Sequence, residues 1–265
     1  GVMAGFCQGG GVGKCIAEWI IDGEPSIDVW AMDVARFGDY ASPQYGTIKS
    51  SENYERRFIM TFPNETLPKG RKQKTTALYD RFVNQGAVMG DSFGLENVLW
   101  FANNKEDAHE EPTIKRSRSH DYVSKEVINV RENVGLIEVA NFSKHEFKGP
   151  DARKFLDHIM AGRLPKPGRI SLSPMLSYRG KLCGDLTVAC LDENEFMVFG
   201  SGAAQEMHRR WFESHIDKFN LNYKNRSDEF HGLSIAGPNS RKVLEKIVRD
   251  DVSNEKFKFR DSRRM

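Results

Sequence analysis

The second half of the chain shows two kinds of apolar spacing. Apolar and polar residues alternate over residues 169–176, 181–191 and 195–199, and turn residues separate these runs. This pattern predicts a three-stranded antiparallel meander. Over residues 203–216 the apolar positions recur instead at the spacing of one helix face. We therefore expect the meander to lead into an amphipathic helix.

A repeated segment surrounds this meander. Residues 147–159 read F-K-G-P-D-A-R-K-F-L-D-H-I, and residues 235–247 read I-A-G-P-N-S-R-K-V-L-E-K-I. Each copy predicts a strand, a Gly-Pro break and a helix, with Asp151 or Asn239 able to cap the helix start. The apolar helix positions also correspond: Phe155 and Ile159 in the first copy, Val243 and Ile247 in the second. The repeat predicts an α+β domain with internally duplicated strand–helix units.

The first half of the chain has weaker periodicity. Residues 14–21 have a helical apolar face that Gly23 and Pro25 end, and the glycines of residues 9–13 predict a tight turn before it. Residues 52–62 fit a helix that runs into a strand. After these residues, the sequence predicts a helix that begins at residue 76 and a strand over 86–90. A polar loop is expected over 105–119, followed by a helix over 121–133 and a strand over 134–139.

Composition narrows the classes of function. The 265 residues carry a net charge of +2, which gives no field that favours nucleic acid or a membrane surface. No apolar run reaches the roughly 18–20 residues that span a bilayer. The chain opens inside a Gly-rich segment without Met, and we expect it to be a piece of a longer protein. Four cysteines match no metal-binding spacing and are expected to be buried and reduced, as in the cytoplasm or, in a eukaryote, the mitochondrial matrix: Cys7, Cys15, Cys183 and Cys190.

The Gly-rich segment allows more than one chemistry. Glycines between a strand and a helix bare backbone N–H groups, where an electron-rich ligand can bind. A phosphate-binding P-loop is excluded because Gln8 and Cys15 stand at its two ends, and no glycine spacing fits a dinucleotide fingerprint. Two interpretations stay open, a turn against a flavin ring and a turn with a structural role only.

Asp185 is the second candidate, because it lies in an otherwise apolar strand. Such a carboxylate is paired, exposed at a strand end, or available as an acid, a base or an anchor for a cationic centre. Tyr178, at the expected hairpin tip, is either a stacking residue for a pterin ring or an ordinary turn residue. The seven histidines include no convincing metal pair, and we expect no metal site.

The opening segment resembles a known family. Residues 4–25 read A-G-F-C-Q-G-G-G-V-G-K-C-I-A-E-W-I-I-D-G-E-P, and the likeness continues to about residue 40. This is similar to the end of the flavin domain in FAD-dependent dimethylglycine and sarcosine dehydrogenases. The resemblance implies flavin contacts at Gly10, Gly11, Val12 and Gly13. The other flavin-binding parts are expected before residue 1, so this chain alone is not expected to bind flavin.

The rest of the chain resembles the aminomethyltransferase (glycine-cleavage T-protein) family. The resemblance covers about residues 75–265 and includes V-G-L-I-E-V at 134–139, G-P at 149–150 and D-L-T-V from Asp185. It implies that Asp185 lies beside tetrahydrofolate and assists one-carbon transfer to it. Arg179 and Gly184 replace a glycine and an acid that stand-alone members carry, which favours the branch fused to flavin dehydrogenases.

Together the resemblances imply three regions: residues 1–24 as a remnant of an α/β FAD-binding domain, 25–75 as a central linker domain, and 76–265 as a truncated folate-binding domain. The whole enzyme would oxidise an N-methylated glycine and pass the one-carbon unit to tetrahydrofolate, with an electron-transfer flavoprotein or oxygen as electron acceptor. The alternatives are a stand-alone aminomethyltransferase, and a folate-binding or structural module without chemistry.

Overall fold

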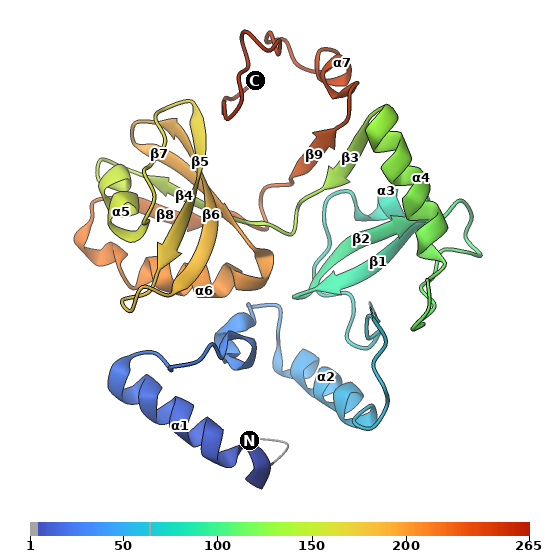
Figure 1. Cartoon of the computed structure of the whole chain (residues 1–265), viewed down its shortest axis with the longest axis vertical. Coiled ribbons are helices and arrows are strands. Elements are labelled where there is room, and N and C mark those ends of the chain that lie inside the picture. Colours follow the sequence, from blue (N-terminus) through green and yellow to red (C-terminus); the bar gives the residue numbers. More distant parts are fainter. Residues whose placement is uncertain (1–4, 64) are drawn as a thin grey trace. The chain divides into compact units, whose positions relative to one another are not determined.

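The structure is a computed structural model that describes residues 5–63 and 65–265. The chain divides into two compact units, residues 1–36 and residues 37–265. The first unit contains helix α1 and two short 3-10 helices: α1 (Phe6–Asp22), η1 (Trp30–Met32) and η2 (Val34–Arg36). The helices of the second unit are α2 (Pro43–Glu55), α3 (Tyr79–Asn84), α4 (Ser119–Glu132), α5 (Ala152–Ile159), η3 (Gly202–Ala204), α6 (Gln205–Glu213), η4 (Ile216–Lys218) and α7 (Ser240–Leu244). Its strands, labelled in Figure 1, are β1 (Ala87–Ser92), β2 (Leu95–Phe101), β3 (Gly135–Glu138), β4 (Ser143–Lys148), β5 (Arg169–Leu176), β6 (Leu182–Asp192), β7 (Glu195–Gly200), β8 (Asn222–Asn225) and β9 (Leu233–Ala236).

Helix α1 corrects the expectation for the Gly-rich segment. The glycines of residues 9–13 lie inside the helix, so the predicted tight turn is wrong. Helix geometry is open to glycine, at a cost of about 1 kcal/mol per residue relative to alanine, and no neighbouring atom forces a turn at these positions. The end of the helix is as predicted, because Gly23 takes the left-handed conformation at φ 81° and donates its N–H to Trp19 O.

The segment between α2 and β1 is held by buried charges rather than by a strand. Helix α2 begins where the Ser42 hydroxyl accepts from Tyr45 N, and it ends at Glu55. The strand expected before residue 62 is absent from the described residues 56–63. Instead, the buried Glu52 carboxylate accepts from Lys49 Nζ and from the backbone N of Lys69, which fixes the returning chain against α2.

The five-stranded antiparallel sheet, in the order β5-β6-β7-β4-β8, contains the main core. The predicted meander is confirmed as β5, β6 and β7, and the helix that follows it is α6. Helices α5 and α6 cover one face of this sheet, where a cluster of buried side chains packs (Figure 1). Its largest fully buried members are Phe147, Phe155, Phe196, Phe212, Leu156 and Met175. The α+β fold class is confirmed.

The predicted repeat is present, but its two copies belong to different sheets. Strand β4 and helix α5 form part of the five-stranded sheet layer, whereas β9 pairs with β3 in a separate two-stranded sheet. Both breaks use a glycine with positive φ, 141° at Gly149 and 116° at Gly237. A Cβ on Gly149 would lie 2.8 Å from the backbone of Leu221, and one on Gly237 would lie 2.6 Å from the backbone oxygen of Asn133. Close backbone approach therefore explains the glycine in both copies.

Two details of the repeat differ from expectation. Neither Asp151 nor Asn239 caps its helix through the side chain, because the Asp151 carboxylate accepts from the backbone N of Asn220 instead. Helix α7 ends at Leu244, so Ile247 lies beyond it and is exposed. The corresponding Phe155 and Ile159 of α5 are buried as predicted.

Two other expectations concern cysteines and membranes. The four cysteines are free, but Cys7 is exposed and Cys15 and Cys183 are half-buried, so the predicted burial is confirmed for Cys190 alone. Within the described residues, no helix combines the length and apolar character needed to cross a membrane.

Candidate functional site

Asp185 lies on the face of the five-stranded sheet that is opposite the core. Side chains alternate along β6, and Leu186 and Val188 point into the core beneath α5 and α6. Asp185 therefore points away from these helices, and its side chain is exposed. Its pairing partner across β5 is Pro174. An exposed carboxylate on a sheet face is free to receive a ligand, but residues 37–265 do not enclose it.

The neighbours of Asp185 on this face are partly apolar. One residue row crosses the sheet from Leu172 on β5 through Thr187 and Phe199 to Lys144 on β4. Leu172, on the edge strand β5, is 63% exposed. This face therefore offers one carboxylate beside an uncovered apolar surface, an arrangement that suits a flat ring carrying N–H donors.

Tyr178 lies on the other side of this sheet. The hairpin predicted at residues 177–180 is confirmed, with Gly180 at φ 75°. The Tyr178 ring contacts the end of α6, where its hydroxyl lies 2.7 Å from His215 Nε2 and its ring centroid 5.4 Å from that of Trp211. Since α6 packs against the core face, the structure does not bring Tyr178 together with Asp185.

A buried histidine supports the strand behind Asp185. His208 of α6 lies between Gly184 and Gly200, and a Cβ on Gly184 would come 2.8 Å from its Nε2 atom. Burial lowers the pKa of His208 to about 4. The neighbouring His145, whose Nδ1 lies 2.9 Å from the Tyr223 hydroxyl, has its pKa lowered to about 3, mainly by burial. Both rings are therefore neutral near pH 7.

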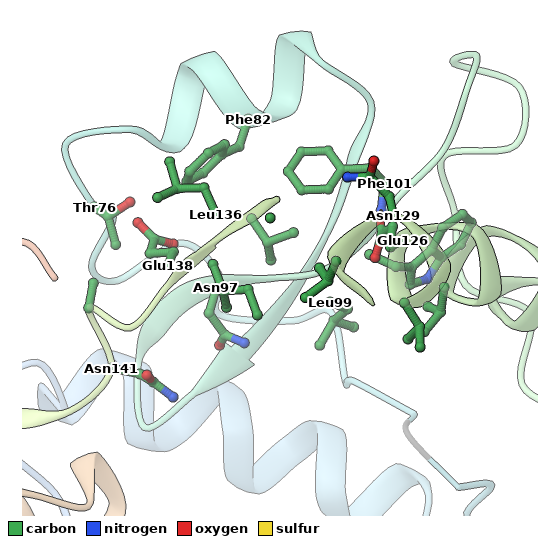
Figure 2. Close-up of a pocket in the computed structure, with 18 of the residues that line it drawn as sticks. Thr76, Phe82, Asn97, Leu99, Phe101, Glu126, Asn129, Leu136, Glu138 and Asn141 are labelled. Atoms are coloured by element: carbon green, nitrogen blue, oxygen red, sulfur yellow. Dashed lines mark hydrogen bonds between the residues drawn. The ribbon is translucent and has the colours of Figure 1, made fainter. Parts of the chain in front are cut away.

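A concave site that the sequence patterns did not indicate lies at β2, β3 and α4. A hollow of ≈ 780 Å³ lies there, with mostly apolar walls, and Figure 2 shows Thr76 and Glu138 side by side at one end of it. We call it the Glu138 hollow. Glu138 gives the same signal in sequence as Asp185, a single acid in an apolar strand, V-G-L-I-E-V. That signal could have identified it.

The residues proposed to contact flavin do not form a binding site in this structure. Helix α1 uses its backbone N–H groups internally, beginning with Gly9 N to Gly5 O at 2.9 Å. The glycines of residues 10–13 therefore present no bare N–H groups, and none of the residues of α1 is buried. Residues 5–36 on their own do not fit a flavin ring. Within the described part of the chain no three His, Cys, Asp or Glu side chains gather as a metal site would require.

Comparison with known families gives two matches along the chain. Residues 78–265 match the family described as GCVT N-terminal domain. The chain belongs to this family. Residues 22–76, which precede the GCVT domain, match the FAD dependent oxidoreductase central domain.

Individual relatives align with nearly the whole chain. Dimethylglycine dehydrogenase of Mus musculus, a mitochondrial protein, is 34% identical over 259 residues, which are 96% of this chain and 30% of the relative. The mitochondrial sarcosine dehydrogenase of Homo sapiens is 27% identical over 303 residues, 97% of this chain and 32% of the relative. The resemblance to these dehydrogenases is confirmed. The chain spans only about a third of their length.

One solved structure supports the fold. The glycine cleavage system aminomethyltransferase T from Bartonella henselae superposes with a TM-score of 0.57 at 20% sequence identity. The match covers 72% of this chain and 47% of that protein. At this identity it shows a shared fold for the GCVT domain.

Proposed function

We propose that this chain is the one-carbon-handling part of a larger FAD-dependent dehydrogenase, which oxidises an N-methylated glycine such as dimethylglycine or sarcosine and passes the one-carbon unit to tetrahydrofolate. The order of a flavin-oxidoreductase central domain and a GCVT domain supports the proposal most directly. The two dehydrogenase relatives align with nearly all of the chain, across both matched regions. On this proposal residues 1–24 belong to a flavin domain, 25–75 to the central domain and 76–265 to the folate-binding domain. In a eukaryote the enzyme would lie in the mitochondrial matrix, with an electron-transfer flavoprotein as its partner.

Within this function, Asp185 would contact the pterin of tetrahydrofolate and assist proton transfer. Its carboxylate can accept hydrogen bonds from the N–H groups of a pterin, while Leu172 offers apolar surface to the ring. Tetrahydrofolate, when bound, supplies the nitrogen that accepts the one-carbon unit. Asp185 would hold or receive the proton that this transfer displaces. The flavin contacts at Gly10, Gly11, Val12 and Gly13 require a conformation other than the helix seen here.

The exposure of Asp185 also favours a second candidate, a folate-binding or structural module without chemistry of its own. A group that transfers a proton acts best in a site that excludes water, and residues 37–265 leave this carboxylate open to solvent. The two candidates predict different behaviour for an Asp185 variant.

The test uses the full-length protein with Asp185→Asn, which removes the charge and keeps the shape. We expect methylene-folate yield per amine oxidised to fall by roughly 100-fold or more, the usual effect of losing a general acid or base. Tetrahydrofolate affinity, measured by isothermal titration, should fall about 10-fold or more with the loss of a charged hydrogen bond. Asp157→Asn is the matched control, since Asp157 is exposed on α5, on the opposite side of the sheet.

The two readouts separate the candidates. Weaker folate binding with an unchanged yield at saturating folate supports the module without chemistry. If Asp185→Asn changes neither affinity nor yield, Asp185 has no part in either function.

A further inference from the structure

The Glu138 hollow has the size and lining of a ligand site. Its ≈ 780 Å³ lies within the usual range for small-molecule pockets, about 300–1,000 Å³. The walls come from β2, β3, α3 and α4 and are mainly apolar: Phe82, Leu95, Leu99, Phe101, Val127 and Leu136. Leu99, Val127 and Leu136 are each more than 40% exposed, so apolar surface remains uncovered there. These walls favour an apolar body in the ligand.

One end of the hollow is polar and has unused acceptors. The Glu138 side chain is only 6% exposed, and both of its carboxylate oxygens are buried without a hydrogen-bond donor. Thr76 Oγ1 and Asn97 Oδ1, which line the same hollow, are likewise buried and unpaired. Leaving buried polar atoms unpaired is costly, and most for a carboxylate. The hollow therefore has four acceptor oxygens that lack an N–H donor, two on Glu138 and one each on Thr76 and Asn97.

His231 is placed to donate to only one of these oxygens. Its Nε2 atom lies 3.3 Å from Glu138 Oε1, so a protonated ring would pair with that oxygen. The second oxygen, Oε2, stays without a donor, as do Thr76 Oγ1 and Asn97 Oδ1. A single imidazole nitrogen cannot serve all of these positions.

We propose that the Glu138 hollow binds a cationic N–H donor, a guanidinium or primary ammonium group, carried on an apolar body. The head group would donate to Glu138 Oε2 and to the oxygens of Thr76 and Asn97, and the body would cover the apolar walls. A guanidinium has five N–H donors in a planar fork and suits several acceptors at once, whereas an anion would be repelled by the buried carboxylate. The site is independent of the proposed function, because it lies on β2 and β3 rather than on β6.

The same head group can belong to a small molecule or to an arginine side chain in an apolar polypeptide segment. Both sources place a cation on an apolar stem, and both would contact the same three side chains. The experiment therefore includes one arm for each source.

The first arm titrates the ¹⁵N-labelled 265-residue chain with hexylguanidinium and, for comparison, with 1-hexanol and hexanoate, and follows amide chemical shifts. Hexylguanidinium should bind at least 10-fold more tightly than 1-hexanol, because a charged hydrogen-bonded pair adds to the same apolar contact. Shifts should concentrate at Glu138, Thr76, Asn97 and Leu136. Equal affinity for the cation, the alcohol and the acid would overturn the proposal, and this comparison needs no variant.

The second arm uses a short apolar peptide with one central arginine and the same peptide with glutamine in its place. Preference for the arginine peptide together with weak hexylguanidinium binding identifies a polypeptide source. The reverse preference identifies a small molecule. The proposal is overturned if hexylguanidinium binds no better than 1-hexanol and the arginine peptide binds no better than the glutamine peptide.

Variants then locate the cation. Glu138→Gln should weaken binding of the preferred cation by roughly 10- to 100-fold, and Thr76→Val by a smaller factor, since a neutral acceptor contributes less than a charged one. Glu132→Gln is the matched control, because Glu132 is exposed at the end of α4 and does not line the hollow. Unchanged affinity in a folded Glu138→Gln chain would overturn the assignment.

Discussion

Two buried histidines, His145 and His208, lie beside each other beneath the five-stranded sheet, with ring centroids 6.3 Å apart. Burial, as the largest cause, lowers the pKa of His145 to about 3 and that of His208 to about 4, from an ordinary value of 6.5. Their proximity adds to the effect on His145. The folded chain therefore keeps both rings neutral, while the unfolded chain binds protons below about pH 6.5.

This difference predicts acid sensitivity. Stability is complete above pH 6.5, where both states are neutral, and it is lost as the pH falls from 6.5 toward 4. Each histidine should lower the free energy of unfolding by about 1.4 kcal/mol per pH unit below 6.5. Urea unfolding at pH 7.5, 6.5 and 5.5 measures this slope, and His208→Leu should reduce it by about half.

A control separates the histidines from other acid effects. The pKa of Asp91 is raised by burial, and its contribution has the opposite sign, so the informative quantity is the difference between the parent and His208→Leu. A parent with no loss of stability between pH 6.5 and 5.5 would contradict the neutral buried pair.

Single acids in apolar strands show how far sequence predicts a site residue. Asp185 and Glu138 give the same pattern in sequence, yet Asp185 is exposed and Glu138 is nearly enclosed. The difference depends on which sheet face each side chain occupies and on which elements cover that face. The sequence around each acid does not specify the elements that cover it, because these elements come from distant parts of the chain. The pattern could find both residues and could not distinguish their environments.

At the scale of elements, a buried ion pair connects the segment before β1 to the β1–β2 hairpin. The Glu96 side chain is 1% exposed, and its carboxylate accepts from both Arg71 Nε, at 2.8 Å, and Arg71 Nη2. Arg71 Nη2 also donates to Met89 O at 3.0 Å, so the guanidinium joins both strands of the hairpin. The planar arrangement of the Nε and Nη2 donors lets one guanidinium serve three acceptor oxygens.

Arg71→Met should destabilise the chain strongly. The substitution keeps most of the side-chain volume and leaves the Glu96 charge buried without a partner, which costs about 3–5 kcal/mol. Chemical denaturation measures this loss. The double variant Arg71→Met with Glu96→Leu should regain most of it, since both charges are then absent.

The Lys69–Glu55 pair provides the contrast, because both of its side chains are at least half exposed. Glu55→Gln should change the free energy of unfolding by less than about 1 kcal/mol. A loss for Arg71→Met as small as that for Glu55→Gln would show that the buried pair does not hold the segment.

Elements with strong periodicity were predictable, and elements that depend on distant partners were not. The meander of β5, β6 and β7 alternates clearly and is confirmed. The turn predicted at the glycines of α1 is wrong because glycine permits a turn and a helix alike, and no described residue packs against these glycines to select the turn. The end of α7 was placed too late because an apolar residue such as Ile247 extends a helical pattern without itself being buried.

At the scale of the whole molecule, the hydrophobic core is confined to the second unit. Every buried hydrophobic side chain among the described residues lies between Tyr45 and Val252. The larger cluster fills the five-stranded sheet layer, and a smaller one around Trp100 lies under the β1–β2 hairpin. Buried Lys144, whose Nζ donates to Ala140 O at 2.9 Å and Phe142 O at 2.7 Å, fastens the connection between β3 and β4. Residues 5–36 contribute no hydrophobic residue to either cluster.

Removing residues 1–36 should therefore leave residues 37–265 folded. The free energy that opposes chain entropy comes mainly from burial of apolar surface, and the described residues of the deleted segment, 5–36, include no buried hydrophobic side chain. Thermal unfolding of residues 37–265 should remain cooperative, with a midpoint within about 4 °C of that of the whole chain, a shift equivalent to roughly 1 kcal/mol or less for a chain of this size. Replacing Phe212, at the centre of the larger cluster, with Ala is the positive control, and we expect it to cost about 3–5 kcal/mol. A deletion as damaging as Phe212→Ala would contradict the conclusion that residues 37–265 contain the stabilising core by themselves.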